Sequence, residues 1–209
     1  MAKDDITKSF KLIGTRPNRP DGFEKVTGRA KYGADISAVG MLHGAVLRSP
    51  YAHARIKSIN SDKAAKLDGV KAIITRDDFP KDREGEPLKL LENTIAGEIA
   101  YYDGHAIAAV AATSVFTAKE ALKEIEVEYE VLPHVIDVDE AMKPNAPIVR
   151  KNAADFSVPE GSSPNVASYI EFGRGDITNG FDKADIVKSG LFKTEAAHQG
   201  YVEPHACMA

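Results

Sequence analysis

The segment His198-Gln-Gly-Tyr-Val-Glu-Pro-His205 gathers two imidazoles, an amide, a phenol and a carboxylate in a short stretch. A metal site is the first chemistry to consider there, but the seven-residue separation of His198 and His205 matches no usual ligand spacing. Cys207 is the single cysteine of the chain, so an internal disulfide and a cysteine-based zinc or iron–sulfur site are excluded. We therefore expect no protein-ligated metal in this chain.

The other candidate residues do not assemble a reaction centre either. His43 and His53 flank a Ser-Pro turn and are expected to be packing or interface residues rather than catalytic ones. Gly28 and Gly33 lack the strand–GxGxxG–helix context of a dinucleotide loop, so NAD and FAD are not expected to bind here. Neither a catalytic triad nor any other catalytic residue is predicted.

Composition limits the classes of function. The 209 residues are 43% hydrophobic, enough for one large domain or for one domain with part of a second. Lys and Arg total 27 against 31 Asp and Glu, and no cluster of like charge suits a phosphate backbone, so nucleic acid is not an expected partner. The N-terminus lacks the apolar region of a signal peptide and no run is long enough to cross a membrane. A cytoplasmic location without membrane association is therefore expected.

The elements that would position these residues begin after a polar arm at residues 1–23, which two prolines keep irregular. Strands are then predicted at 41–48, 55–59 and 70–75. The first two are expected to pair with each other. A short helix ended by Gly69 precedes the third strand, which gives compact alternation of helix and strand.

The middle of the chain carries the clearest periodicities. Residues 80–98 are rich in Glu and Lys and are expected to run over the surface until the chain returns to the core at Tyr101. A buried strand at 106–112 follows, and residues 126–131 alternate glutamate with apolar side chains, as in a half-exposed strand. Between them lies a helix capped by Thr113 or Ser114, with a core-facing stripe of Val115, Ala118, Leu122 and Ile125.

The last third of the chain is expected to begin a second domain. Residues 143–164 are rich in Pro, Asn, Ser and Ala, which is typical of a linker. Strand-like runs follow at 167–172 and 186–194, with a short helix at 177–184 opened by Asp176. The run 195–209 reads as the middle of a domain, because a strand begins there with nothing left to pair it.

Several motifs in a fixed order resemble the aldehyde oxidase/xanthine dehydrogenase a/b hammerhead domain over residues 24–137. They are Glu24-Lys-Val-Thr-Gly-Arg-Ala-Lys-Tyr32, Gly40-Met-Leu-His-Gly-Ala-Val-Leu-Arg-Ser-Pro-Tyr-Ala-His-Ala-Arg-Ile56, Asp68-Gly-Val-Lys-Ala-Ile-Ile-Thr75 and Ile125-Glu-Val-Glu-Tyr-Glu-Val-Leu-Pro133. The continuation at Phe172-Gly-Arg-Gly-Asp176 and at 198–205 is similar to the start of the first molybdopterin-binding domain of that family.

The resemblance implies an α+β fold, namely the a/b hammerhead followed by an incomplete α/β molybdopterin-binding domain. The domain organisation expected from it and from composition is an N-terminal arm at 1–23, the hammerhead domain at 24–142, a linker at 143–164 and the beginning of the molybdopterin-binding domain at 165–209.

The resemblance also implies a function. The chain would be the N-terminal part or a split subunit of a molybdenum hydroxylase, which oxidises an aldehyde, purine or other N-heterocycle or aromatic substrate with oxygen from water. Molybdenum is held by molybdopterin in such enzymes, and iron–sulfur clusters and FAD lie on other chains or domains. The expected partners are the remainder of the molybdopterin subunit, the iron–sulfur and FAD subunits and a small-molecule substrate. The family's general-base glutamate falls beyond residue 209, so the isolated chain is expected to be inactive and to bind no cofactor by itself.

Two residues are cofactor-binding candidates by the same resemblance. Glu203 occupies the family's Tyr-x-Glu pair and either orders the cofactor region through backbone amides or is a structural buried acid. Gln199 either serves an oxo ligand or the pterin edge or only satisfies backbone groups. The xanthine-type glutamine aligns with Ala197, and His105 stands where many relatives have glutamine, so this chain departs from the pattern at both places.

A different class of function remains open on the sequence. The chain could be a non-catalytic structural module that contacts other subunits and binds no cofactor by itself.

Overall fold

The protein is described here by a computed structural model, which covers residues 11–79, 88–150, 158–201, 203 and 205–209. The chain forms two compact units. One comprises residues 40–189, and the other combines residues 1–39 with residues 190–209.

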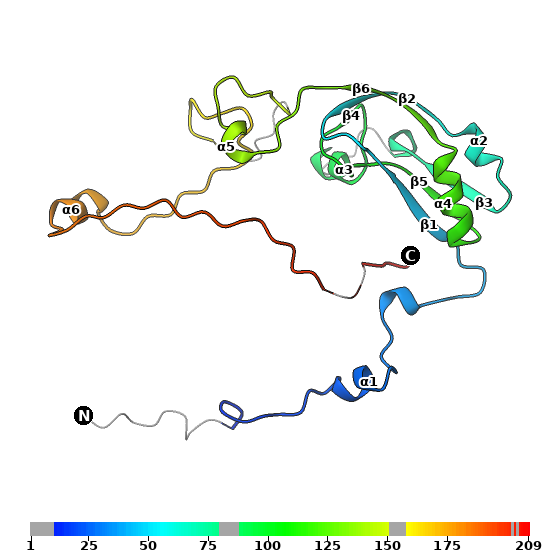
Figure 1. Ribbon diagram of the computed structural model, residues 1–209, viewed down its shortest axis with the longest axis horizontal. Helices are drawn as coiled ribbons and strands as arrows, with labels where there is room; N and C mark the ends of the chain where they lie inside the picture. Colours follow the sequence, from blue (N-terminus) through cyan, green and yellow to red (C-terminus); the bar gives the residue numbers. More distant parts are fainter. Residues whose placement is uncertain (1–10, 80–87, 151–157, 202, 204) are drawn as a thin grey trace. The chain divides into compact units, whose positions relative to one another are not determined.

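The larger unit contains two three-stranded sheets (Figure 1). The first has the order β1-β5-β3, with β1 at His43–Arg48, β5 at Ala106–Ala112 and β3 at Val70–Ile74. The second has the order β4-β2-β6, with β4 at Ile99–Ala100, β2 at Ala54–Asn60 and β6 at Glu126–Val131. Every pairing is antiparallel. Strands that follow each other along the chain therefore alternate between the two sheets.

This alternation shows that the predicted pairing of the first two strands was wrong, although both strands exist. The loop after β1 is held by the loop before β5, because the Ser49 N–H donates to the His105 carbonyl at 2.8 Å and the Gly104 N–H donates to the Ser49 carbonyl at 2.8 Å. The residues after β1 consequently lie beside the residues that precede β5, and β1 does not form a hairpin with β2. The apolar strand β5, with Ile107, Ala108, Val110 and Ala112 buried, takes the centre of the first sheet.

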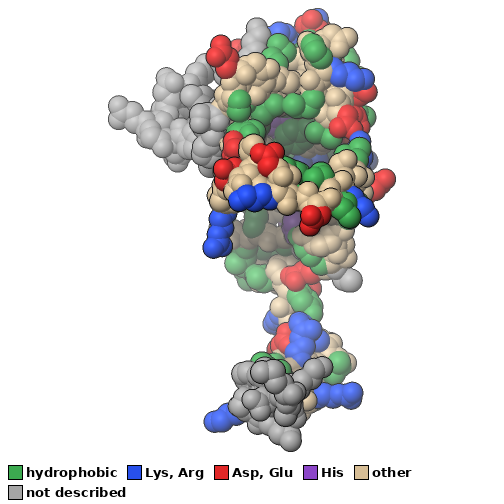
Figure 2. All heavy atoms as spheres, turned by 90° about the vertical axis from the view of Figure 1, so that its left-hand side faces the viewer, with side chains coloured by type: hydrophobic (Ala, Val, Ile, Leu, Met, Phe, Trp, Pro, Cys, Tyr) green, Lys and Arg blue, Asp and Glu red, His purple; other side chains and the backbone are tan. Residues whose placement is uncertain are grey.

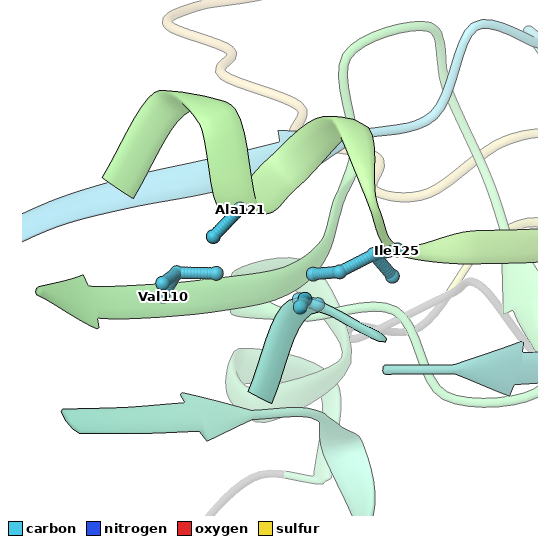
Figure 3. Packing of buried hydrophobic residues seen from close by; sticks show 5 residues of the cluster. Val110, Ala121 and Ile125 are labelled. Atoms are coloured by element: carbon cyan, nitrogen blue, oxygen red, sulfur yellow. The ribbon is translucent and has the colours of Figure 1, made fainter. Parts of the chain in front are cut away.

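Helix α4, Val115–Lys123, covers β1 and β5 and closes the main core (Figure 1). Ser114 caps it as predicted, because its side chain accepts from the Thr117 N–H. Figure 3 shows Val110, Ala121 and Ile125 directed toward one another between the helix and β5. The predicted stripe was right for Ala118, Leu122 and Ile125, but Val115 is 51% exposed and Ala121 is buried in its place.

The edge strand β6 carries the predicted alternation, since its three glutamates are exposed and Val127 and Tyr129 pack against the core. The glutamates pair with cations from β2 and α2, the short helix Asp62–Ala65. The nitrogen-to-oxygen distances are 3.6 Å for Arg55–Glu130, 3.8 Å for Lys57–Glu128 and 2.5 Å for Lys63–Glu126. Charge along an exposed edge disfavours pairing with a foreign strand.

Helix α3, Leu88–Thr94, was missed by the sequence analysis. The predicted surface run covered it, and the first part of that run, residues 80–87, lies outside the described residues. The chain also re-enters the core earlier than predicted, because Ile95 and Ala96 are 5% and 0% exposed. High Glu and Lys content was a poor guide here because both residues also favour helices.

Beyond β6, the larger unit contains α5, Val138–Ala141, and α6, Ile177–Asp182. The predicted cap of α6 is confirmed, since the Asp176 side chain accepts from the Asn179 N–H. The strand-like runs at 167–172 and 186–194 form no strand, so this prediction was wrong. Apolar alternation alone does not make a strand when no neighbouring strand supplies a hydrogen-bonded ladder.

The second unit contains little regular structure in its described residues. It has α1, Gly22–Val26, and a 3-10 helix at Gly33–Asp35. Its two chain segments meet near Gly33, where a Cβ added to the glycine would lie 3.5 Å from Cβ of Ala206.

Two properties apply to the described surface as a whole. No helix among the described residues is long and apolar enough to cross a membrane. Figure 2 shows acidic and basic side chains intermingled over the face in view, in agreement with the charge balance of the sequence.

Candidate functional site

The predicted cofactor residue Gln199 belongs to a small polar network around Tyr201. Its Nε2 donates to the Tyr201 hydroxyl at 3.1 Å, and the same hydroxyl lies 2.7 Å from Nε2 of His205. The His205 and Tyr201 rings are 5.2 Å apart between centroids. The structure therefore links Gln199 and His205 through the Tyr201 hydroxyl, a contact that the sequence analysis did not predict.

Glu203, the second predicted cofactor residue, is exposed. Gln199 and Tyr201 are exposed as well. Together the segment presents an amide, a hydroxyl and a carboxylate, which are groups able to hydrogen-bond the polar edge of a heterocycle.

His198 and His205 each have a hydrogen-bond partner other than a metal ligand among the described residues. His198 accepts the Gly200 N–H through Nδ1 at 3.0 Å, whereas His205 binds Tyr201. Among the residues that the structure describes, no group of three or more His, Cys, Asp or Glu side chains could hold a metal ion.

A second cluster, which the sequence analysis did not identify, lies in the larger unit around the ring of Tyr101. The His53 and His105 rings lie 6.3 and 6.2 Å from it, and Tyr102 stacks on His105 at 4.3 Å. Cζ of Arg150 lies 4.2 Å from the centre of the Tyr101 ring. Sequence reasoning missed this cluster because His53 and Arg150 lie almost 50 residues from Tyr101 along the chain.

Both histidines of this cluster are buried, as expected of packing residues. His53 is 6% exposed and its Nδ1 lies 2.6 Å from the Pro133 carbonyl oxygen, so that nitrogen carries the proton. His105 is fully buried, and its Nδ1 accepts the Tyr101 N–H at 3.2 Å. Within the described structure, Nε2 of each ring is buried without a hydrogen-bond partner.

The electrostatics of His105 favour a neutral ring. Burial lowers the pKa of His105 below its usual value, and the positive charge of Arg150 acts in the same direction, while the Glu92 backbone opposes the shift. The hydrogen bond from the Tyr101 N–H also requires an Nδ1 atom that carries no proton. His105 is therefore suited to holding the Tyr101–Tyr102 corner and poorly suited to carrying charge.

Two arginines of the first strands, Arg48 and Arg55, are engaged within the chain. Nη1 of Arg48 donates to the Gly104 carbonyl at 2.8 Å, and Arg55 pairs with Glu130 across the sheet. Arg48 thus reinforces the junction of β1 with the loop before β5.

Comparison with known proteins gives the family. The family model described as "Aldehyde oxidase and xanthine dehydrogenase, a/b hammerhead domain" matches residues 27–133, which is more than half of the chain. The chain belongs to this family, as the motifs over residues 24–137 indicated.

Individual relatives extend the similarity beyond the hammerhead. The chain is 35% identical to a probable xanthine dehydrogenase subunit of Bacillus subtilis, over 95% of this chain and 25% of that protein. It is 32% identical to the nicotinate dehydrogenase large molybdopterin subunit of Eubacterium barkeri, over 95% of this chain and 44% of that protein.

The solved structure of a Cu,Mo-CO dehydrogenase in its carbon monoxide reduced state gives a TM-score of 0.64 at 30% identity, covering 83% of this chain and 23% of that one. The chain is thus homologous to molybdenum hydroxylase large subunits, and it spans about a quarter of the length of most of these relatives.

Proposed function

We propose that this chain supplies the hammerhead domain and the first part of the cofactor-binding domain of a molybdenum hydroxylase large subunit. The observation that carries the proposal is the continuity of the similarity, which reaches 99% of the chain in some relatives and so includes the segment around Gln199 and Glu203 as well as the hammerhead. A domain boundary within residues 143–164 belongs to the same proposal.

The residues of the terminal segment fit a pterin better than a protein-bound metal. Gln199 offers two amide N–H donors and a carbonyl acceptor, and Glu203 offers a carboxylate that can receive N–H groups. When bound, a molybdenum–pterin cofactor would supply the oxidising centre. The contribution of this chain would be to hold the pterin edge through Gln199 and Glu203, with Tyr201 orienting the Gln199 amide through the 3.1 Å hydrogen bond.

The substrate class follows from the relatives and is part of the proposal. Their names include dehydrogenases of xanthine, nicotinate and carbon monoxide and an aldehyde oxidoreductase. We infer an aldehyde or N-heterocycle as substrate, with iron–sulfur and FAD subunits as electron-transfer partners.

The proposal is tested by purifying the chain with the products of neighbouring genes and measuring molybdenum and pterin in the complex and in the isolated chain. Molybdenum in the complex and its absence from the isolated chain would support the proposal. A stable monomer that recruits neither partner nor cofactor would overturn it and favour a structural module.

The two candidate residues are tested in the same complex. Gln199→Ala and Glu203→Gln should each lower the molybdenum content of the purified complex, because each removes a hydrogen-bonding group from the pterin edge. Glu195→Gln is the matched control, since Glu195 is an exposed carboxylate of the same segment. If all three variants contained as much molybdenum as the unaltered complex, a role for Gln199 and Glu203 in cofactor binding would be excluded.

A further inference from the structure

The chain that follows residue 133, where the match to the hammerhead family model ends, is held together at Asn165. The Asn165 amide donates to the carbonyls of Ala141 and Pro147 at 3.1 and 3.0 Å, and its Oδ1 accepts the Val149 N–H at 3.1 Å. Ser163 adds a bond from its hydroxyl to the Ala141 carbonyl at 3.1 Å. We call residues 141–149 and 163–167 the cap segment.

Arg150 joins the cap segment to the hammerhead. Its guanidinium lies over the Tyr101 ring at 4.2 Å and donates to Oδ1 of Asn93 at 3.0 Å. The Glu92 carboxylate lies 3.6 Å from the same nitrogen. The Arg150 side chain is only 18% exposed, so these contacts are partly shielded from water and stronger than those of a surface pair.

The surface that receives Arg150 is itself well held. The Tyr102 hydroxyl donates to the Asn93 carbonyl at 2.9 Å, which ties α3 to the Tyr101–Tyr102 corner. The buried His105 ring fixes the same corner by accepting the Tyr101 N–H and stacking on Tyr102. Arg150 therefore docks on a rigid platform.

An open pocket of about 430 Å³ lies at this junction, lined by Tyr101, Tyr102 and Asn93 from the hammerhead and by Ala141, Val149 and Asn165 from the cap segment. Arg150 also lines this pocket, so its contacts with Tyr101 and Asn93 span the junction beside open space.

We propose that Arg150 is the docking residue that fixes the cap segment on the hammerhead, so that the chain leaves the hammerhead in one defined arrangement instead of through a flexible linker. The inference rests on contacts within this chain and stands whether or not the proposed function holds. Arg150 is therefore a positioning residue, because it fixes where the cap segment lies.

Hydrogen–deuterium exchange of the full chain tests the proposal through two groups of amides. The Val149 and Val166 amides report on the cap segment, because they bond to Asn165 and to the Ser163 carbonyl. The β5 amides, at the centre of a sheet, report on the hammerhead. Arg150→Ala should raise the exchange rate of the cap amides roughly tenfold or more and leave the β5 amides unchanged.

Three further variants make the test specific. Arg150→Lys should give an intermediate rate, because lysine keeps the charge near Glu92 but lacks the planar fork of donors. Arg174→Ala, at an exposed arginine, is the matched control and should change neither group. If Arg150→Ala unfolds the hammerhead, Asn93→Ala removes one acceptor only and should still raise the rate of the cap amides.

Two results would overturn the proposal. One is unchanged exchange of the cap amides in both Arg150→Ala and Asn93→Ala, which would mean that Asn165 and its neighbours hold the segment without docking. The other is rapid exchange of these amides in the unaltered chain, at the rate of the exposed residues that precede α6.

Discussion

At the scale of single residues, His105 makes the stability of the larger unit depend on pH. In the unfolded chain the ring titrates near pH 6.5, whereas burial in the fold lowers its pKa. Above pH 6.5 both states hold a neutral ring and the effect vanishes. As the pH falls below 6.5, His105 is protonated in the unfolded state before it is protonated in the folded state, so the free energy of unfolding decreases.

We expect the melting temperature to fall between pH 7.5 and pH 5.5, and we expect His105→Gln to reduce this fall. Thermal unfolding followed by circular dichroism at the two pH values provides the measurement. His134→Gln serves as the control because His134 is exposed. An equal pH dependence in His105→Gln and in the unaltered protein would show that His105 does not contribute to it.

Gly69 illustrates a residue whose type is required by the backbone. Its φ is +89°, and an added Cβ would lie 2.6 Å from the Thr113 hydroxyl oxygen, closer than such contacts allow. Gly69→Ala should therefore destabilise the protein by about 1–3 kcal/mol. Urea unfolding measures the change, with Gly44→Ala as the control because a side chain there meets nothing within 4 Å. Similar urea midpoints for the two variants would show that a side chain at Gly69 is not strained.

Residue roles were predictable only where the signal was local. The caps Ser114 and Asp176 depend on neighbours in sequence, and the structure bears them out. The end of the short helix was placed too late, because α2 stops at Ala65 and not at Gly69. Arg150 went unnoticed because its hydrogen-bond partner Asn93 lies 57 positions away, and no spacing rule connects the two. The roles of Gln199 and Glu203 remain predictions from the family resemblance.

At the scale of elements, strong periodicity was a reliable guide and pairing was not. The strands at 106–112 and 126–131 were predicted with the bounds that the structure has, because each carries an unbroken pattern. Which strands pair depends on which edges the loops bring together, and for β1 that is decided by hydrogen bonds between Ser49, Gly104 and His105. Nothing in either strand alone encodes that choice.

The corrected face of α4 can be tested by two truncations near the ends of the helix. Ile125 is 7% exposed and belongs to the main core, so Ile125→Ala should cost about 2–5 kcal/mol of stability. Val115 is 51% exposed, so Val115→Ala should change stability by less than about 0.5 kcal/mol. Chemical denaturation gives both values. A comparable loss of stability in the two variants would indicate that Val115 belongs to the core-facing stripe after all.

At the scale of the whole molecule, the two sheets share their interior. Leu47, Ile59 and Val127 pack against both core clusters, one around Val110 and Ala121 and the other around Ile107 and Ala100. A disturbance in one cluster is therefore transmitted to the other through the same side chains. We expect the hammerhead to unfold as one cooperative unit.

The measurement is urea unfolding of Val110→Ala followed by tyrosine fluorescence and by far-ultraviolet circular dichroism. Tyr129 packs against the cluster that does not contain Val110. Its fluorescence, isolated from that of the other tyrosines by subtracting the signal of a Tyr129→Phe variant, reports on the other sheet. Both signals should shift to the same lower midpoint. A fluorescence midpoint that stays at the value of the unaltered protein would show that the two clusters unfold independently.

The overall architecture was predicted from the ordered motifs and their resemblance to a family, not from composition or periodicity. Local patterns located most strands of the larger unit, but they could not reveal that odd and even strands belong to different sheets. They also failed at 167–172 and 186–194, where the alternation resembles that of a strand and no ladder forms.

The strict alternation of strands between sheets has a consequence for synthesis of the chain. When β1 and β3 have left the ribosome, their common partner β5 has not yet been made, because it begins only at Ala106. At about 5–20 residues per second, β1 waits several seconds or longer for that partner. During this interval its apolar side chains are open to chaperones and to other nascent chains, so the sheet order sets a period of exposure that a hairpin of β1 and β2 would have avoided.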